Sequence, residues 1–225
     1  MSRPIWWNEA CLALAAADPV FARLIEQSGD ASLVSRGDPF STLARSVVGQ
    51  QISVKAAQSV WNRFIRTAML RGEPMTDQPD DTAALAKLTM TPAAVLAMDH
   101  QALRGCGLSA RKAEYLRDLA QHFESATVFP ERWPALGDEA VIAELVQVRG
   151  IGRWTAEMFL IFNLQRPDVL PLDDIGLLRG IGKHWFDDAM PSRAQAKEIA
   201  QAWAPWRTAA TWYLWRSLDP VPVEY

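Results

Sequence analysis

The chain has 225 residues, which at roughly 150 residues per domain corresponds to one large domain or two small lobes that fold together. Hydrophobic residues make up 49% and charged residues 22%, as in ordinary globular proteins, and the sequence has no run of the ~20 apolar residues that a membrane span requires. The 23 basic and 26 acidic residues give a net charge of −3, which argues against a protein that coats long stretches of nucleic acid.

The N-terminal residues lack the apolar core of a signal peptide. Two cysteines, Cys11 and Cys106, cannot by themselves build a disulfide framework, a zinc site or a four-cysteine iron–sulfur cluster. We therefore expect a cytoplasmic protein with no membrane partner and no cysteine-bound metal.

Nearly every segment has the spacing of an amphipathic helix, so the sequence predicts an all-α fold. Asp38 and Thr91, each followed by proline, and Ser109 are typical N-caps, and Asp138 opens an acidic first turn. A polar segment over 72–81 and a proline-containing segment over 128–134 break the helical pattern. The predicted helices span 8–16, 19–28, 39–48, 53–70, 92–104, 109–123, 138–147, 152–164, 174–181, 192–203 and 205–217.

Two glycines, Gly150 and Gly152, lie where one predicted helix ends and the next begins. Glycines one residue apart permit a tight turn with positive φ, and their amides can approach a phosphate closely. The next helix adds unsatisfied N–H groups and the positive end of its dipole, while Arg149 and Arg153 add charge. Ile151 is expected to plug into the core and hold the turn. The segment therefore indicates either a phosphate clamp or a helix corner that binds nothing.

Two adjacent carboxylates, Asp173 and Asp174, follow an apolar run and open the predicted helix over 174–181. Taken alone, they favour a purely structural interpretation, with Asp173 as the N-cap and Asp174 in the first turn. The segment 179–183 is similar to the hairpin segment 149–153, but the flanking residues differ, so we treat this repeat as coincidence.

Together, the hairpin at 148–152 and the downstream carboxylates resemble the helix-hairpin-helix superfamily of DNA glycosylases, in particular its bacterial 3-methyladenine DNA glycosylase II branch. Segments 46–57, 107–113 and 203–215 are similar to that branch in the same order, and the resemblance covers about residues 36–217. It implies two helical lobes with the hairpin at the cleft and no N-terminal β domain. The expected division is a central bundle over 36–147 and a second lobe made of 1–35 and 148–225, which together form one compact catalytic unit.

The resemblance implies a monofunctional DNA glycosylase of base excision repair, which hydrolyses the N-glycosidic bond of alkylated purines of the 3-methyladenine and 7-methylguanine type. Asp174 matches the catalytic aspartate of the family, which leaves Asp173 as the expected N-cap. Bifunctional relatives such as endonuclease III carry a lysine after the hairpin that attacks the sugar. Trp154 takes that place here, and an indole cannot form an imine. The implied enzyme uses water, leaves an abasic site and, unlike endonuclease III, has no iron–sulfur cluster.

Trp154 and Trp215 match aromatic positions of the family's base pocket, where a flipped base is recognised by stacking and shape. Electron-rich rings attract positively charged alkylated purines by cation–π interaction, worth ~0.5–2 kcal/mol. For Trp215, packing of the last helix into the core is an equal alternative. Met158 replaces a tyrosine of the related bacterial enzyme, which leaves the range of substrates open.

Gln51 matches the residue that the family inserts into the duplex beside the flipped base, although a turn residue that merely joins two helices is an equal alternative. The resemblance also implies a monovalent cation held by the backbone carbonyls of Val146, Val148 and Ile151. His100, His122 and His184 are isolated and are expected to be ordinary histidines. The other expected DNA-binding residues are Arg149, Gly150, Ile151, Gly152, Arg153, Thr155, Ser53 and Lys55.

Two other functions stay open. The first is a glycosylase of the same fold for another lesion, such as hypoxanthine, ethenoadenine or 8-oxoguanine. The second is a non-catalytic DNA-binding module, since the same hairpin occurs in proteins that only hold DNA. For the leading interpretation we expect a monomer that acts on double-stranded DNA containing damaged bases and needs no cofactor for catalysis.

Overall fold

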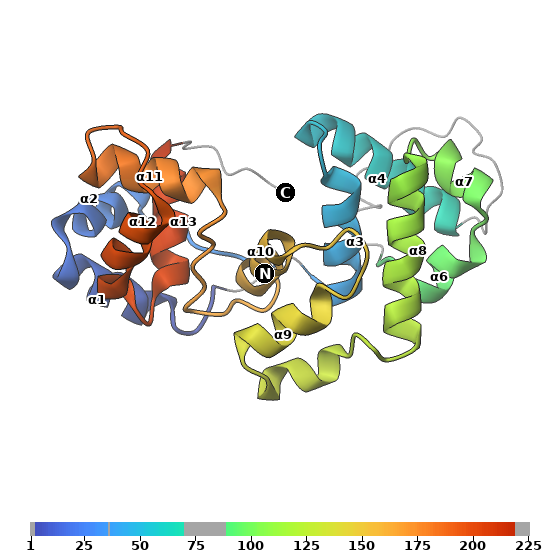
Figure 1. Ribbon diagram of the computed structural model, residues 1–225, viewed down its shortest axis with the longest axis horizontal. Helices are drawn as coiled ribbons and strands as arrows, with labels where there is room; N and C mark the ends of the chain where they lie inside the picture. Colours follow the sequence, from blue (N-terminus) through green and yellow to red (C-terminus); the bar gives the residue numbers. More distant parts are fainter. Residues whose placement is uncertain (1–2, 36, 70–88, 219–225) are drawn as a thin grey trace. The chain divides into compact units, whose positions relative to one another are not determined.

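The computed structural model describes residues 3–35, 37–69 and 89–218 (Figure 1). Within these ranges every regular element is a helix and none is a strand, which confirms the predicted all-α class. None of the described helices is both long and apolar enough to cross a membrane. The predicted polar loop over 72–81 lies outside the described residues.

The described residues form two compact units, of which unit 1 contains 3–35 and 157–218. Within it, α1 packs against α2 and α11 packs against α13 (Figure 1). The predicted helix over 192–203 continues from an α-helix into a short 3-10 helix. The helices of unit 1 are α1 (Trp7–Ala17), α2 (Pro19–Ser28), the second part of α10 (Arg153–Phe162), α11 (Ile175–Trp185), α12 (Arg193–Ile199), η2 (Ala200–Trp203) and α13 (Arg207–Leu218).

Aromatic side chains fill the core of unit 1. Trp7 and Trp203 are each 1% exposed, and Phe21 is fully buried. The rings of Phe21 and Trp203 meet edge to face at 5.3 Å, a favoured geometry for aromatic pairs. Gly180 of α11 faces α13, where a Cβ atom would lie 2.8 Å from the Cβ of Leu214. The absence of a side chain at Gly180 therefore lets α11 and α13 approach closely.

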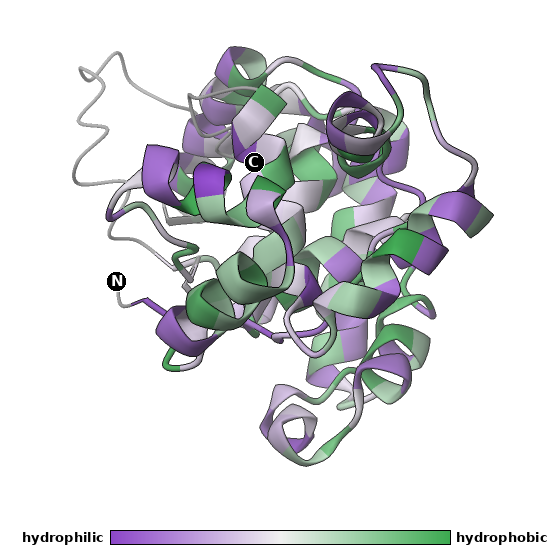
Figure 2. Cartoon of the chain, turned by 90° about the vertical axis from the view of Figure 1, so that its left-hand side faces the viewer, coloured by the Kyte–Doolittle hydropathy of each residue, from purple (hydrophilic) through white to green (hydrophobic). Residues whose placement is uncertain are grey.

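Unit 2 contains residues 37–69 and 89–156, and its α8 packs against both α3 and α6 (Figure 1). The hydropathy colours alternate around the helices in Figure 2, as the amphipathic spacing of the sequence predicts. Its helices are α3 (Pro39–Gly49), α4 (Val54–Met69), α6 (Pro92–Ala97), α7 (His100–Gly105), α8 (Ala110–Glu124), η1 (Pro130–Ala135), α9 (Asp138–Leu145) and the first part of α10.

The predicted helix starts of unit 2 are confirmed by their caps. The side chains of Asp38, Thr91 and Ser109 each accept a hydrogen bond from a backbone N–H in the first turn of the following helix. The single helix predicted over 92–104 is wrong, because the structure breaks it into α6 and α7. Asp99 causes the break: its backbone is extended, and its Oδ1 accepts a hydrogen bond from the N–H of Ala102 at 2.7 Å.

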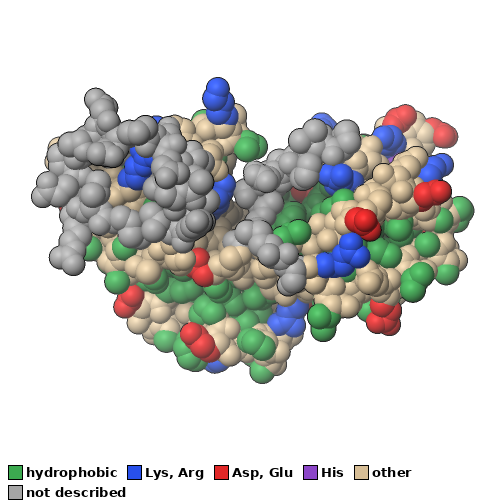
Figure 3. Space-filling model, turned by 180° about the vertical axis from the view of Figure 1, so that it is seen from behind, with side chains coloured by type: hydrophobic (Ala, Val, Ile, Leu, Met, Phe, Trp, Pro, Cys, Tyr) green, Lys and Arg blue, Asp and Glu red, His purple; other side chains and the backbone are tan. Residues whose placement is uncertain are grey.

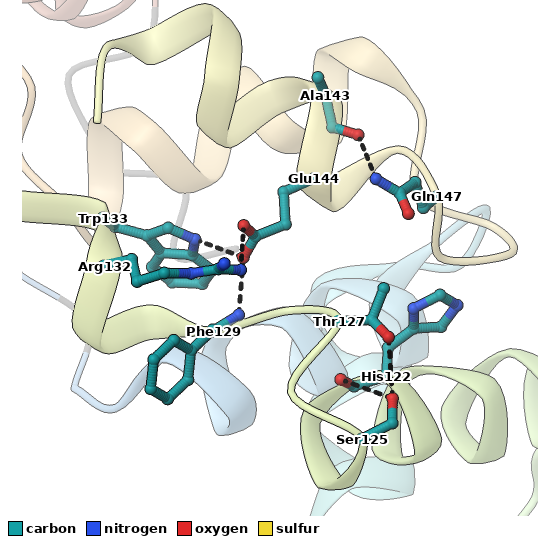
Figure 4. A network of polar contacts seen from close by, with 9 residues as sticks. All are labelled: His122, Ser125, Thr127, Phe129, Arg132, Trp133, Ala143, Glu144 and Gln147. Atoms are coloured by element: carbon teal, nitrogen blue, oxygen red, sulfur yellow. Dashed lines mark hydrogen bonds and ion pairs between the residues drawn. The ribbon is translucent and has the colours of Figure 1, made fainter. Parts of the chain in front are cut away.

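A buried carboxylate joins η1 to α9 in unit 2 (Figure 4). Glu144 is 8% exposed, and its Oε1 accepts hydrogen bonds from the backbone N–H of Phe129 at 2.6 Å and from the indole N–H of Trp133 at 2.8 Å. Its Oε2 lies 3.2 Å from the guanidinium of Arg132. Because a buried charge is tolerated only when it is paired, this network fixes the C-terminal end of α9 against η1.

The boundary between the two units differs from the sequence-based prediction. We expected the second lobe to resume at residue 148, whereas the structure divides the chain between Ala156 and Glu157, inside α10. The hairpin therefore belongs to the same compact unit as the central bundle. The reason is that hydrogen bonds tie the hairpin to α8 and to the end of α3, as the next section describes.

Candidate active site and nucleic-acid interface

The glycine hairpin connects α9 to α10 in unit 2. Val148 is 1% exposed and Ile151 is 4% exposed, so Ile151 plugs into the core as the sequence predicted. The N–H of Ile151 donates to the carbonyl of Val148 at 3.1 Å, which closes the turn. Gly150 has φ +86°, a conformation that favours glycine. A Cβ atom at Gly152 would meet nothing within 4 Å, so a phosphate could approach its backbone closely.

Helix α8 supports the hairpin from one side. A Cβ atom at Gly150 would lie 2.2 Å from the ring of Tyr115, so the ring packs directly on the glycine backbone. The carboxylate of Asp118 accepts a hydrogen bond from the backbone N–H of Arg149 at 2.8 Å. On the other side, the amide Nε2 of Gln50 donates to the carbonyl of Gly150 at 2.9 Å. The hairpin is therefore held in place by side chains from two other elements.

Both arginines of the hairpin form ion pairs with glutamates. Arg149 lies 3.2 Å from Glu114 of α8, and Arg153 forms two hydrogen bonds with Glu139 of α9. The Arg153 hydrogen bond lowers the pKa of Glu139 below its usual value. The side chains of Arg149 and Arg153 are 61% and 51% exposed, so both remain accessible to an incoming anion.

Among the described residues on the face drawn in Figure 3, basic and acidic side chains are interspersed and form no continuous basic band. This distribution agrees with the net charge of −3. Thr155, which we expected at the DNA contact, is only 7% exposed, so its side chain is directed into the protein and not toward a phosphate.

The turn between α3 and α4 carries the expected wedge residue. Gln51 is exposed and has φ +59°, which is uncommon for a residue other than glycine. The hydroxyl of Ser53 accepts a hydrogen bond from the N–H of Ala56 at 3.3 Å, so it caps the start of α4. Lys55 is exposed. These positions suit both interpretations of Gln51, as a wedge and as a turn residue.

The N-cap of α11 is not the carboxylate that we expected. Asp174, and not Asp173, is the N-cap: its Oδ1 accepts a hydrogen bond from the N–H of Leu177 at 2.6 Å. The reason is a turn in which the N–H of Asp174 donates to the carbonyl of Pro171 at 2.9 Å, so the helix starts one residue later. Asp173 is exposed and pairs with Arg193 at 2.7 Å.

Asp174 and Trp215 are brought together in unit 1. The indole N–H of Trp215 donates to Oδ1 of Asp174 at 2.8 Å, and the indole ring stacks on Phe162 with centroids 5.7 Å apart. A Cβ atom at Gly176 would lie 3.0 Å from this same Oδ1 and 3.0 Å from the Trp215 ring. The carboxylate is therefore held by two donors in a place where a glycine leaves room for both side chains.

Helix α10 carries the other two expected pocket residues, Trp154 and Met158, and also Phe162. Trp154, Met158 and Phe162 are spaced four residues apart and therefore share one face of the helix. All three are half-buried, while all the residues between them are buried. Trp154 falls in unit 2, whereas Met158, Phe162 and Trp215 fall in unit 1 with Asp174.

Comparison with known proteins decides the family. Residues 44–205 match the family described as HhH-GPD superfamily base excision DNA repair protein, which is more than half of the chain. The chain belongs to the HhH-GPD superfamily.

Its relatives include proteins named DNA-3-methyladenine glycosylase. DNA-3-methyladenine glycosylase 1 of Schizosaccharomyces pombe is 32% identical over 214 residues, which cover 93% of this chain and 87% of the relative. DNA-3-methyladenine glycosylase 2 of Escherichia coli is 34% identical over 179 residues, covering 79% of this chain and 57% of the relative.

Two solved structures are similar over nearly the whole chain. The 3-methyladenine DNA glycosylase of Schizosaccharomyces pombe in complex with abasic DNA has a TM-score of 0.74 at 32% identity, covering 96% of this chain and 98% of that one. The DNA-3-methyladenine glycosidase of Bacillus halodurans has a TM-score of 0.78 at 31% identity, covering 93% and 89%. The HhH-GPD fold expected from the sequence is thereby confirmed.

Several residues of this HhH-GPD protein that shape the candidate site were missed in the sequence. Phe162 could have been found, because it lies one helical turn after Met158. Gln50 is adjacent to the expected wedge, but nothing local indicates a bond to a carbonyl 100 residues away. Tyr115 and Asp118 lie on the inner side of α8, where their contacts with the hairpin depend on packing alone.

The histidines of this HhH-GPD protein show no arrangement that suggests catalysis. Nε2 of His184 and the hydroxyl of Ser217 share a hydrogen bond at 3.0 Å. Burial lowers the pKa of His184. His100 is exposed, and His122 lies 3.6 Å from Asp118 within α8. Among the described residues, no cluster of histidine, cysteine and acidic side chains could hold a metal ion.

Proposed function

We propose that this HhH-GPD protein is a DNA glycosylase of base excision repair that acts as a monomer and releases alkylated purines, 3-methyladenine above all, from double-stranded DNA. The observation that carries the proposal is the carboxylate of Asp174, half-exposed and held by the N–H of Leu177 and the indole of Trp215. The likeness to proteins named DNA-3-methyladenine glycosylase supports the choice of substrate.

The chemistry requires an anion beside the sugar. As the C1′–N bond breaks, its electron pair stays with the base, which loses the positive charge that alkylation gave it, and the sugar becomes oxocarbenium-like. Asp174 stabilises this charge and accepts a proton from the water whose oxygen bonds to C1′. Two hydrogen bonds orient the carboxylate before the substrate arrives, so little reorganisation is needed during the reaction.

The enzyme is proposed to be monofunctional. The first turn of α10 presents Trp154, whose indole nitrogen is no nucleophile, where bifunctional relatives carry a lysine. Water is then the attacking group, and the product is an abasic site in an intact strand. Borohydride reduction during the reaction should trap no protein–DNA adduct, whereas a covalent adduct on a denaturing gel would contradict this assignment.

The principal test is base release from duplex DNA methylated on its purines, measured by chromatography of the freed bases. We expect Asp174→Asn to abolish release while DNA affinity stays close to that of the unmodified protein. Asp173→Asn is the matched control, because Asp173 is the adjacent carboxylate but is exposed and paired with Arg193. Activity retained by Asp174→Asn, or lost equally in both variants, would refute the role of Asp174.

A hairpin cation forms part of the proposal. The carbonyls of Val146, Val148 and Ile151 are neutral oxygen donors of the kind that monovalent cations bind, and the C-terminal end of α9 adds partial negative charge. Val148 already accepts one hydrogen bond, but a carbonyl oxygen has two lone pairs. When bound, the cation would supply positive charge for a DNA phosphate. DNA affinity should then be lower in tetramethylammonium than in potassium chloride at equal ionic strength, and equal affinities would argue against the site.

A second candidate substrate class rests on Met158. This flexible, half-buried side chain on the shared face of α10 suits a pocket that accepts differently shaped purines, such as hypoxanthine or ethenoadenine. A panel of duplexes with one lesion each would compare them directly. Greater release of one of these bases than of 3-methyladenine would reassign the substrate, and DNA binding without any release would favour a non-catalytic module.

A further inference from the structure

Gln50 directly connects the hairpin and the turn that carries Gln51, the two turns that we expected from the sequence to contact DNA. It is the C-cap of α3, is half-buried, and immediately precedes the exposed Gln51. Its Nε2 donates to the carbonyl of Gly150 at 2.9 Å, across 100 positions of the chain. Both ends of this bond lie within unit 2, so it belongs to one compact body.

At the hairpin end, the bond restrains one peptide plane. The carbonyl of Gly150 and the N–H of Ile151 belong to the same planar peptide group. The carbonyl is held by Gln50, and the N–H is held by the carbonyl of Val148 at 3.1 Å. With both edges hydrogen-bonded, the peptide resists rotation, which helps the backbone amides of Gly152 and Arg153 that follow it to keep their direction.

At the other end, the bond restrains the turn between α3 and α4. Gln51 adopts φ +59°, a conformation that a residue other than glycine keeps only when its surroundings hold it. Residues 51–56 are all exposed, so this turn gains little from burial. The carbonyl of Val48, just before the turn, also accepts a hydrogen bond from Lys112 of α8 at 2.7 Å. Gln50 and Lys112 therefore anchor the base of an otherwise solvated turn.

We propose that Gln50 is a positioning residue that fixes the Gln51 turn relative to the hairpin. Insertion of Gln51 into the duplex and phosphate binding by the hairpin then occur at matching positions along the DNA. The inference rests on the proposed DNA glycosylase function. Gln50 does not touch the reacting atoms. It acts on base extrusion through the two turns, and its loss slows unstacking of the damaged nucleotide more than it weakens binding to undamaged DNA.

The test compares Gln50→Leu and Gln50→Glu with the unmodified protein. Leucine keeps approximate size but removes the donor, whereas an ionised glutamate directs a negative oxygen at the carbonyl of Gly150. We expect single-turnover base release to fall about 3- to 10-fold with leucine, the range set by one net hydrogen bond, and further with glutamate. Affinity for undamaged duplex should change less than about twofold, given that the hairpin amides remain.

Unstacking is followed by the fluorescence of 2-aminopurine placed beside the lesion, a signal that a purely structural role would leave unchanged. Gln147→Leu is the matched control, because Gln147 lies three residues before Gly150 but its amide donates to the carbonyl of Ala143 in α9, at 3.2 Å (Figure 4). Thermal melting of each variant shows whether it is folded. The Gln50 variant whose melting temperature lies closer to that of the unmodified protein is the one used to judge the inference.

The outcomes separate the inference from the function on which it rests. If the unmodified protein releases no base from any lesion, the proposed function fails. If it is active and both Gln50 variants show normal unstacking and normal release, the positioning role is overturned. A loss of release with unchanged fluorescence, or an equal loss in Gln147→Leu, also overturns it.

Discussion

Replacing Trp215 with phenylalanine isolates one hydrogen bond of the candidate active site. The change removes the indole N–H that lies 2.8 Å from Oδ1 of Asp174 but keeps an aromatic ring to stack on Phe162. A hydrogen bond to a charged group contributes about 1.5–3 kcal/mol, which corresponds to about 10- to 150-fold in rate if it is fully expressed in the transition state. Because Leu177 still donates to the same oxygen, we expect a loss near the lower end, about 10- to 30-fold.

The assay is single-turnover release of 7-methylguanine from methylated duplex, with DNA affinity measured separately by fluorescence anisotropy. Trp206→Phe serves as the control, since Trp206 is also half-buried in unit 1 but stacks on Trp6, outside the candidate site. We expect Trp215→Phe to lower the rate at saturating protein and to leave affinity unchanged. A rate within about threefold of the unmodified protein would show that orientation of Asp174 by this bond contributes little. A loss of affinity equal to the loss of rate would instead make Trp215 a binding residue.

Three further substitutions test other parts of the structure. Gly176→Ala places a Cβ atom 3.0 Å from both the Trp215 ring and the adjacent carboxylate oxygen, so single-turnover release should fall while the melting temperature stays within a few degrees; unchanged release would contradict this. Gly150→Ala places a side chain where φ is +86° and its Cβ atom would lie 2.2 Å from the Tyr115 ring. DNA affinity in an anisotropy titration should therefore fall at least about tenfold, and normal affinity would show that the hairpin tolerates a side chain. Glu144→Ala leaves buried N–H donors without their acceptor, so urea unfolding should show a loss of about 3 kcal/mol, and a loss below about 1 kcal/mol would mean that the network contributes little.

The parts of the structure that were predicted correctly are those determined by short stretches of sequence. Asp38, Thr91 and Ser109 cap helices because a side-chain oxygen reaches an N–H three residues away, which is visible in any local pattern. The hairpin was predictable for the same reason, since it depends on two glycines and one apolar residue. The break at Asp99 was missed although its cap is local, because the apolar spacing on both sides continues in the same helical period.

The parts that were missed depend on distances between elements. Which of Asp173 and Asp174 caps α11 is decided by a backbone hydrogen bond to Pro171, and side-chain chemistry alone cannot distinguish two adjacent aspartates. The bond from Trp215 to Asp174 exists because α11 and α13 pack closely at Gly180. A sequence gives the donor and the acceptor but not the separation of the two helices that carry them.

The glutamates that face Arg149 and Arg153 bear on how the protein would search DNA. In the free protein each guanidinium already has a carboxylate neighbour, so a distant duplex meets nearly balanced charge at the clamp. Attraction beyond a Debye length of ~8 Å is then weak, and a phosphate must come close enough to take the place of a carboxylate. Given the proposed function, we expect a short dwell time on intact duplex, which would leave the protein free to sample many sites before a damaged nucleotide retains it.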